Sequence, residues 1–425
     1  MTSDYEKAIS FKELYKGLQK SQKNVMWKDS VAGYSMNGLK NTYKLRKSLL
    51  DGSYKLSQYQ RFKVYEPKER EILATRIRDR QYQRSICDNI LYPEMTRRFI
   101  RDNCACQKGR GVDDALNRMK VHLRRHYKKT GGNEGYVLQC DIKKYFPSTP
   151  HKVAIKMITK AVRDKEAAVC ACSIVTSFCE PKIEDELRSR GIELEPAKRI
   201  AHAITVERVK VLQSELVKSE HTEQVKKAAH KRVESLLNVV VQNREERENL
   251  IRWALSEEFS GVGLGSQVSQ LVELLVLNDL DHFIKEQLHI ECYIRYMDDF
   301  ILLHPDKKYL QYCRQEITRE VEKLGLTLNG KTELYEIRQG IKFLKWRFIL
   351  TDTGKVVMRM SKKSISKQRR KMRKLKGKLE RGEITIQDIQ NNFHSWMANA
   401  KRGNTKAIRW EMRKYYNELF EEVIR

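Results

Sequence analysis

Two adjacent carboxylates lie in YIRYMDDFILL, residues 293–303, between apolar flanks on both sides. Burying carboxylates in such a setting costs free energy unless a partner compensates their charge. We expect Asp298 and Asp299 to form a two-residue turn between two apolar strands. A third acid, Asp141, lies at the end of another short apolar run, YVLQCDI at 136–142. In a mixed sheet these strands can be neighbours, so the sequence predicts three carboxylates at one edge of a sheet.

Three clustered carboxylates repel one another unless cations neutralise them. Hard oxygen ligands favour Mg²⁺, which keeps part of its water shell and shares itself with substrate phosphates. Two such ions about 3.5–4 Å apart would serve in-line phosphoryl transfer. The pattern therefore predicts two Mg²⁺ ions, with Mn²⁺ as a second candidate metal. The alternative is a solvated Asp-Asp turn without metal, and the apolar flanks together with Asp141 argue against it.

The charge balance points to a polyanionic partner. The chain has 84 Lys and Arg against 55 Asp and Glu, a net charge of +29. Such a surplus favours nucleic acid, and its spread along the chain argues against one membrane-binding tail. The N-terminus lacks a signal-like apolar core, and no run of 18 apolar residues occurs, so we expect a cytoplasmic protein. Its nine cysteines are then expected as reduced thiols.

Six segments differ in composition and periodicity. Residues 1–60 are basic with a helical pattern, and residues 62–111 are polar and rich in Arg. A buried strand at 136–142 is followed by a helix, and 165–258 are charged and poor in glycine. Strands and helices alternate from there to residue 350, and the tail from 361 onward is basic and helical. The fourth segment predicts two or three amphipathic helices. In the tail, Thr385 and Asp388 predict a capping box. The helix that it opens places six residues on one face: Ile386, Ile389, Phe393, Trp396, Met397 and Ala400.

Seven motifs resemble, in chain order, those of reverse transcriptases, and YMDD is one of them. The other six are YEPKEREILATRIRDRQYQRSI (65–86), NCACQKGRGVDDAL (103–116), CDIKKYFPS (140–148), GLGSQVSQ (263–270), GLTLNGKTEL (325–334) and GIKFLKW (340–346). HSWMANAKRGNTKAI (394–408) resembles the thumb of the bacterial diversity-generating class. The resemblance implies an α+β right-hand polymerase, with fingers at 61–135, a ferredoxin-like palm at 136–164 and 259–350, and a helical thumb at 351–425. Residues 165–258 would be a helical insertion between motifs A and B that also contributes to the fingers and palm.

The resemblance also implies a catalytic set. Asp141, Asp298 and Asp299 would be the metal ligands, with the backbone carbonyl of Ile142 as a further oxygen. Lys331 would help the pyrophosphate leave as a general acid.

The nucleotide and the primer would contact further residues. The incoming nucleotide would lie against Lys68, Arg70, Arg78, Arg80, Phe146, Leu264 and Gly265. Among these, Phe146 would occupy the place of a ribose 2′-OH and so favour deoxynucleotides. Leu264 stands where the familiar pattern has glutamine, which puts high fidelity in doubt. Phe343, Leu344 and Trp346 would form the primer grip.

The resemblance is to small bacterial enzymes of the diversity-generating or antiphage-defence-associated type. The expected function is synthesis of complementary DNA from dNTPs on an RNA template, with a dedicated structured non-coding RNA as partner. We hypothesise that the insertion binds that RNA or a second copy of the chain, giving a homo-oligomer, and we expect no membrane partner. Three alternatives stay open: a mutagenic diversity-generating retroelement enzyme, a template-independent or protein-primed DNA polymerase, and a non-catalytic RNA-binding scaffold.

Overall fold

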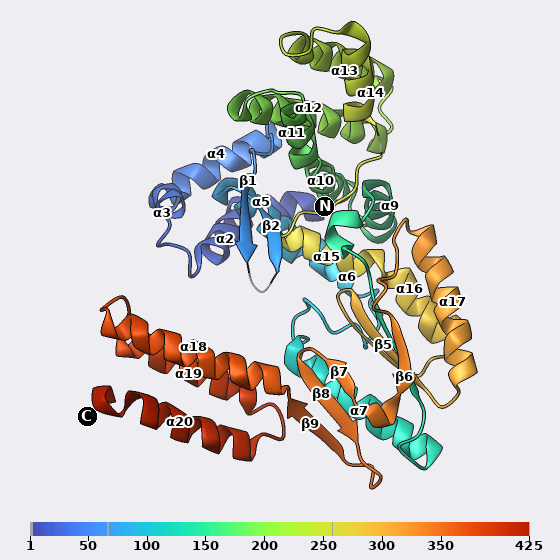
Figure 1. Cartoon of the computed structure of the whole chain (residues 1–425). Helices are drawn as coiled ribbons and strands as arrows, with labels where there is room; N and C mark the ends of the chain where they lie inside the picture. Colours follow the sequence, from blue (N-terminus) through green and yellow to red (C-terminus); the bar gives the residue numbers. More distant parts are fainter. Residues whose placement is uncertain (1–2, 66–67, 257, 425) are drawn as a thin grey trace. The chain divides into compact units, whose positions relative to one another are not determined.

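The computed structural model describes residues 3–65, 68–256 and 258–424 (Figure 1). The chain divides into two compact units whose segments alternate along the sequence. Unit 1 comprises Met1–Ile100, Ile142–His282 and Thr318–Leu328. Unit 2 comprises Arg101–Asp141, Phe283–Ile317 and Asn329–Arg425. The fold is α+β, as expected from the sequence.

A four-stranded sheet forms the centre of unit 2, in the order β4–β5–β3–β6. Its strands are β3 (Tyr136–Asp141), β4 (Cys292–Tyr296), β5 (Asp299–His304) and β6 (Glu333–Glu336). All neighbouring pairs are antiparallel, so the expectation of a mixed sheet is wrong. Because β5 lies between β3 and β4, which run parallel to each other, the strand order is that of a βαββαβ sheet. The four central residues of β5 are all buried, which explains its continuous apolar run.

A second, three-stranded antiparallel sheet in unit 2 comprises β7 (Ile341–Phe343), β8 (Trp346–Leu350) and β9 (Val356–Met360). The sequence predicts one strand over 340–350, but the structure has a hairpin there. Leu344 and Lys345 form its two-residue turn with φ of +48° and +70°. Positive φ at both central residues matches the twist of a hairpin, although glycine or asparagine usually occupies such positions. The core of this region also includes α7 (Val112–Thr130), which supplies Met119 and Leu123.

The basic tail of unit 2 forms α18 (Lys362–Glu380), α19 (Ile386–Ala400) and α20 (Lys406–Ile424). The capping box is confirmed: Thr385 N donates to Asp388 Oδ2 at 2.9 Å, and Asp388 N donates to Thr385 Oγ1 at 3.3 Å. The expected face of α19 is confirmed as well. Ile389, Phe393, Met397 and Ala400 are buried, and the Phe393 and Tyr416 rings stack at 4.2 Å.

Unit 1 is mostly helical. Outside the insertion its elements are α1 (Asp4–Ala8), α2 (Phe11–Gln22), α3 (Asp29–Met36), α4 (Gly38–Leu50), β1 (Gln60–Tyr65), β2 (Glu69–Ala74), α5 (Ile77–Ile86), η1 (Cys87–Leu91), α6 (Tyr92–Thr96), α8 (Tyr145–Ser148), α9 (His151–Ala161), α15 (Gln267–Val276) and α16 (Asn278–His282). Helix α5 is polar in sequence yet largely buried, because neighbouring helices satisfy its side chains. Gln81 Nε2 donates to Leu14 O at 3.1 Å and to Thr42 Oγ1 at 2.7 Å. Gly17 permits this approach, since a Cβ there would lie 2.5 Å from Gln81 O.

The insertion forms five helices rather than the two or three expected. They are α10 (Lys165–Ser177), α11 (Glu180–Ser189), α12 (Leu194–Leu216), α13 (Thr222–Asn238) and α14 (Arg244–Leu255). Short breaks divide the charged segment. Helices α11 to α14 each contribute to one apolar seam, through Ile183, Ile204, Val233 and Ile251 respectively. Of the remaining helices, η2 (Phe283–Gln287) lies in unit 2 and α17 (Lys307–Lys323) spans the boundary of the units.

Two expectations about the whole chain concern membranes and thiols. Across the residues that the structure describes, we find no helix with the length and apolar character needed to span a membrane. All nine cysteines lie within those residues as free thiols, and only Cys106 is exposed.

Candidate active site

Asp141 and Asp299 lie opposite each other at one end of the sheet in unit 2, as the last residue of β3 and the first of β5. Tyr296 also pairs with Asp299, so the two turn residues are Met297 and Asp298. The expected Asp298–Asp299 turn is therefore wrong by one residue. Met297 adopts a φ of +58°, in the left-handed region that a tight hairpin requires. Asp299 thus belongs to a strand, where pairing on both sides fixes its backbone.

Burial is the main effect that disfavours the charged form of Asp299. Burial raises the pKa of Asp299 to about 7; the hydrogen bond from Gln139 opposes this shift, and the charges of Asp141 and Asp298 add to it. Gln139 Nε2 lies 3.3 Å from Asp299 Oδ1, while Gln139 Oε1 accepts a hydrogen bond from Tyr335 Oη at 3.0 Å. Gln139 is a site residue that the sequence did not reveal. Its position in β3, two residues before Asp141, was the available signal.

Asn329 is a second such residue. Its side-chain Nδ2 donates to Asp141 Oδ2 at 2.6 Å, and its backbone N–H donates to Asp141 O at 2.7 Å. Lys331 follows two residues later, is exposed, and donates its backbone N–H to Asn329 Oδ1 at 3.3 Å. Ile142 is 1% exposed and forms a bridge with Leu328. The proton-donor role of Lys331 and the ligand role of the Ile142 carbonyl stay predictions.

The acids fit a hard divalent cation by donor chemistry. They supply three carboxylates, and a bound cation would offset both the burial and the neighbouring negative charges that raise the pKa of Asp299. In the described part of the chain, however, no three His, Cys, Asp or Glu side chains converge closely enough to hold an ion. Amide groups of Asn329 and Gln139 contact Asp141 and Asp299 instead. A metal would have to displace or share these contacts.

Part of the predicted nucleotide-binding set comes together in unit 1. Leu73 N in β2 donates to Leu264 O at 3.1 Å, which holds the loop of motif B against the strand that carries Arg70. Gly265 has a φ of +115°, a conformation that side chains disfavour. Phe146 is half-buried, and its carbonyl accepts a hydrogen bond from Val262 N at 2.8 Å.

The four basic residues of this set divide into two pairs. Lys68 and Arg70 are exposed next to Glu66 and Pro67, two residues of the same motif that lie outside the described residues. The side chains of Arg78 and Arg80 contact other residues of unit 1. Arg78 donates to Ser57 Oγ at 3.1 Å and stacks on Tyr54, and Arg80 donates to Thr75 O at 3.2 Å. Burial also lowers the pKa of Arg80.

The three residues of the predicted primer grip occupy different environments in the β7–β8 hairpin. Phe343 and Trp346 are 1% and 3% exposed and belong to the core of unit 2. Leu344 is half-buried in the turn. Phe343 and Trp346 therefore anchor the turn in the core, and the more exposed residues Leu344 and Lys345 form its tip.

Comparisons with known proteins found no matching family model and no matching curated protein. Solved structures of telomerases show a weak similarity. A Candida albicans telomerase in complex with a TWJ fragment of telomeric RNA has 11% identity and a TM-score of 0.39, covering 71% of this chain and 46% of that chain. An apo telomerase from Candida tropicalis has 10% identity and a TM-score of 0.39, covering 71% of this chain and 47% of that chain. A form of it truncated from the C-terminal domain has 11% identity and a TM-score of 0.38, covering 75% of this chain and 59% of that chain. This chain thus spans less than two thirds of each, and similarity at this level carries no conclusion about activity.

Proposed function

We propose that this chain is a reverse transcriptase, an RNA-directed DNA polymerase that adds deoxynucleotides to a primer 3′ hydroxyl. The observation that carries the proposal is the pairing of Asp141 with Asp299 directly beside the turn that holds Asp298. The order of seven sequence motifs supports it independently. The βαββαβ strand order also supports it, since Asp141 ends β3 and Asp299 begins the paired strand β5 directly after Asp298.

When bound, two Mg²⁺ or Mn²⁺ ions would activate the primer hydroxyl and neutralise charge that develops on the phosphates. Asp141, Asp298 and Asp299 would hold the ions, and Gln139 would keep the Asp299 carboxylate in place. Lys331 would give a proton to the departing pyrophosphate.

The nucleotide would be held by residues of unit 1. Lys68 and Arg70 are the exposed cations of the set and would contact the triphosphate, whereas Arg78 and Arg80 already donate to groups of their own unit. Gly265 would let the backbone approach the nucleotide closely. Phe146 would exclude a ribose 2′-OH.

The partner would be an RNA held mainly through its phosphates. Between Lys362 and Lys378, the tail carries ten Lys or Arg and no acid. Such a helix tracks a phosphate backbone without reading sequence. We further propose that the enzyme acts in antiphage defence with a dedicated structured non-coding RNA.

A mutagenic retroelement enzyme is the second candidate, and Leu264 favours it. Its apolar side chain cannot offer the hydrogen bonds of the glutamine that usually stands there. This candidate predicts frequent mismatches in the complementary DNA, which Leu264→Gln should reduce.

The decisive experiment combines primer extension with sequencing of copurifying nucleic acid. We compare wild type, Asp298→Ala/Asp299→Ala, and Asp29→Ala, which removes an exposed acid at the start of α3. The proposal is supported if wild type and Asp29→Ala both yield complementary DNA copied from one recurrent RNA and the double variant yields none. A homopolymer points to template-independent synthesis. RNA without DNA in all three would contradict the proposal and leave a scaffold.

A further inference from the structure

Residues 102–104 run along the free edge of the four-stranded sheet, beside β4. Arg295 N donates to Asp102 O at 2.9 Å, and Cys104 N donates to Arg295 O at 3.0 Å. Asn103 forms a parallel bridge with Arg295. This segment is therefore attached by an isolated parallel bridge to β4, the strand that leads into the Met297–Asp298 turn.

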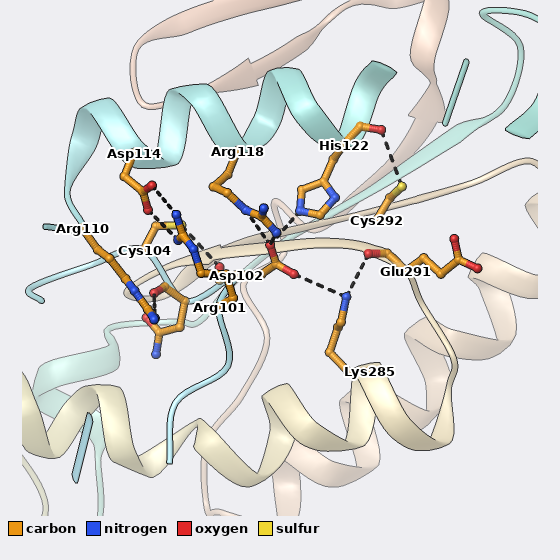
Figure 2. Close-up of polar contacts among 11 residues, drawn as sticks. Arg101, Asp102, Cys104, Arg110, Asp114, Arg118, His122, Lys285, Glu291 and Cys292 are labelled. Atoms are coloured by element: carbon orange, nitrogen blue, oxygen red, sulfur yellow. Dashed lines mark hydrogen bonds and ion pairs between the residues drawn. The ribbon is translucent and has the colours of Figure 1, made fainter. Parts of the chain in front are cut away.

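The side chain of Asp102 attaches this segment to two neighbouring helices (Figure 2). It is 4% exposed, and its Oδ1 accepts hydrogen bonds from Arg118 and, at 2.8 Å, from His122 Nε2. Oδ2 lies 3.3 Å from Lys285 Nζ, which also donates to Glu291 O at 2.8 Å. One carboxylate thus joins the edge segment to α7 and to η2.

The neighbouring residue strengthens the attachment to α7. Arg101 donates two hydrogen bonds to Asp114, at 2.6 and 2.8 Å. Asp114, Arg118 and His122 recur every four residues and so lie on one face of the helix, as Figure 2 shows.

Asp102 is charged at neutral pH, because its partners outweigh its burial. Burial works to raise the pKa of Asp102, but His122 and Arg118 hold this pKa well below its usual range. Burial lowers the pKa of His122, and the hydrogen bond and charge of Asp102 work in the opposite direction. Removing the carboxylate would leave Arg118 and Lys285 close together without an anion between them.

Two contacts lead from this segment to the catalytic turn. Arg295, which is 0% exposed, donates from Nη1 to Met297 O at 3.0 Å. Cys106 Sγ lies 3.8 Å from Met297 Sδ. Met297 is the turn residue with positive φ and immediately precedes Asp298. Arg295 therefore contacts the backbone of Met297, and Cys106, two residues beyond the edge segment, contacts its side chain.

We propose that Asp102 is a positioning residue for the catalytic turn. Through residues 102–106 and Arg295 it holds Met297, and thereby Asp298, in place relative to the paired Asp141 and Asp299. The inference rests on the proposed function for its kinetic consequence. Its structural part, the link from Asp102 to Met297, stands without it.

The test uses Asp102→Asn, which keeps the shape of the side chain and removes its charge. Glu291→Gln is the control, since it removes a charge from the exposed Glu291–Lys129 pair in the same unit. We expect kcat for primer extension to fall at least tenfold with KM for template–primer within twofold, because small displacements of reacting groups affect the chemical step most. The Mg²⁺ concentration for half-maximal rate should rise about threefold or more.

A second measurement follows the turn without catalysis. With ¹³C-methyl methionine, assigned through Met297→Leu, the Met297 methyl resonance should shift in Asp102→Asn and not in Glu291→Gln. Lys285→Gln removes the 3.3 Å contact with Asp102 and the hydrogen bond to Glu291 O. It guards against an Asp102 variant that fails to fold, and it should shift the Met297 resonance in the same direction by less.

The outcomes separate the two claims. A lower melting temperature of Asp102→Asn, with unchanged kcat per folded molecule and an unchanged Met297 resonance, would show that Asp102 only stabilises unit 2 and overturn the inference. A wild-type protein without primer extension would overturn the proposed function, while the resonance shift would still decide the link from Asp102 to Met297.

Discussion

The insertion (165–258) and the C-terminal tail (351–425) are both helical bundles with an apolar seam, yet their charges differ sharply. The insertion has 16 Lys and Arg and 17 Asp and Glu, a net charge of −1 (16 − 17). The tail has 20 and 8, a net charge of +12 (20 − 8). The excess of positive charge that characterises the whole chain is therefore absent from the insertion and large in the tail.

Some of the charged residues of the insertion form ion pairs that join its helical segments. Glu246 of α14 pairs with Arg190 beyond α11, and Lys226 of α13 lies 3.0 Å from Glu215 of α12. In the tail, by contrast, Arg369 of α18 reaches Glu411 only at 3.7 Å. The comparison favours the tail as the RNA surface. For the insertion, it favours the second of our two hypothesised partners, another copy of the chain.

The largest expected effects come from cores, where the two regions should behave alike. Phe393→Ala in the tail and Leu237→Ala in the insertion remove buried side chains and should each destabilise the protein by about 3 kcal/mol. Urea denaturation measures this loss. RNA affinity should fall only for Phe393→Ala. An equal loss of affinity for Leu237→Ala would remove the distinction between the regions.

Surface charge should separate the regions next. Changing four exposed cations of α18 to Gln, at Lys363, Lys367, Arg370 and Lys374, should weaken RNA binding about a hundredfold and reduce its salt dependence, because fewer counterions are released. The matched control changes four exposed cations of the insertion: Arg199, Lys218, Lys227 and Lys231. It should alter affinity by less than about twofold. Filter binding across several salt concentrations tests both, and similar losses would contradict the comparison.

A pH effect should come from His151 of α9, next to the insertion. Burial lowers the pKa of His151 to about 4, so protonation favours the unfolded chain. Its stabilising effect is complete above the unfolded pKa of about 6.5 and is lost as pH falls toward 4. Between pH 8 and pH 5 the contribution of His151 to this loss should be about 2 kcal/mol, so the loss should differ by that amount between wild type and His151→Gln. Urea denaturation at both pH values measures it, and His221→Gln, at an exposed position, should keep the wild-type difference.

The smallest expected effect concerns one ion pair of the insertion. Arg190 and Glu246 are partly exposed, so their coupling in a double-mutant cycle should be about 0.5 kcal/mol. RNA affinity should not change. A coupling several times larger would mean that the paired charges hold the insertion together, rather than merely neutralise it.

Much of the candidate site could be predicted from sequence because its signals are local. Apolar runs around Asp141 and Asp299 predicted buried strands, and those strands pair. The one-residue error in the turn arose because apolar flanks do not determine strand register. Register depends on Tyr296 facing Asp299 across the hairpin. Gln139 and Asn329 were missed since an ordinary amide side chain gains its role only from the carboxylate that it contacts.

Sequence alone determined the features whose causes lie within a few residues. These are the capping box at Thr385 and Asp388, the buried face of α19 and the basic charge of α18. Tertiary structure alone decided burial of the polar helix α5 and the partners of Asp102, which lie 16, 20 and 183 residues away. Periodicity and capping act through neighbouring backbone groups, whereas a buried charge is stable only where distant segments bring donors to it.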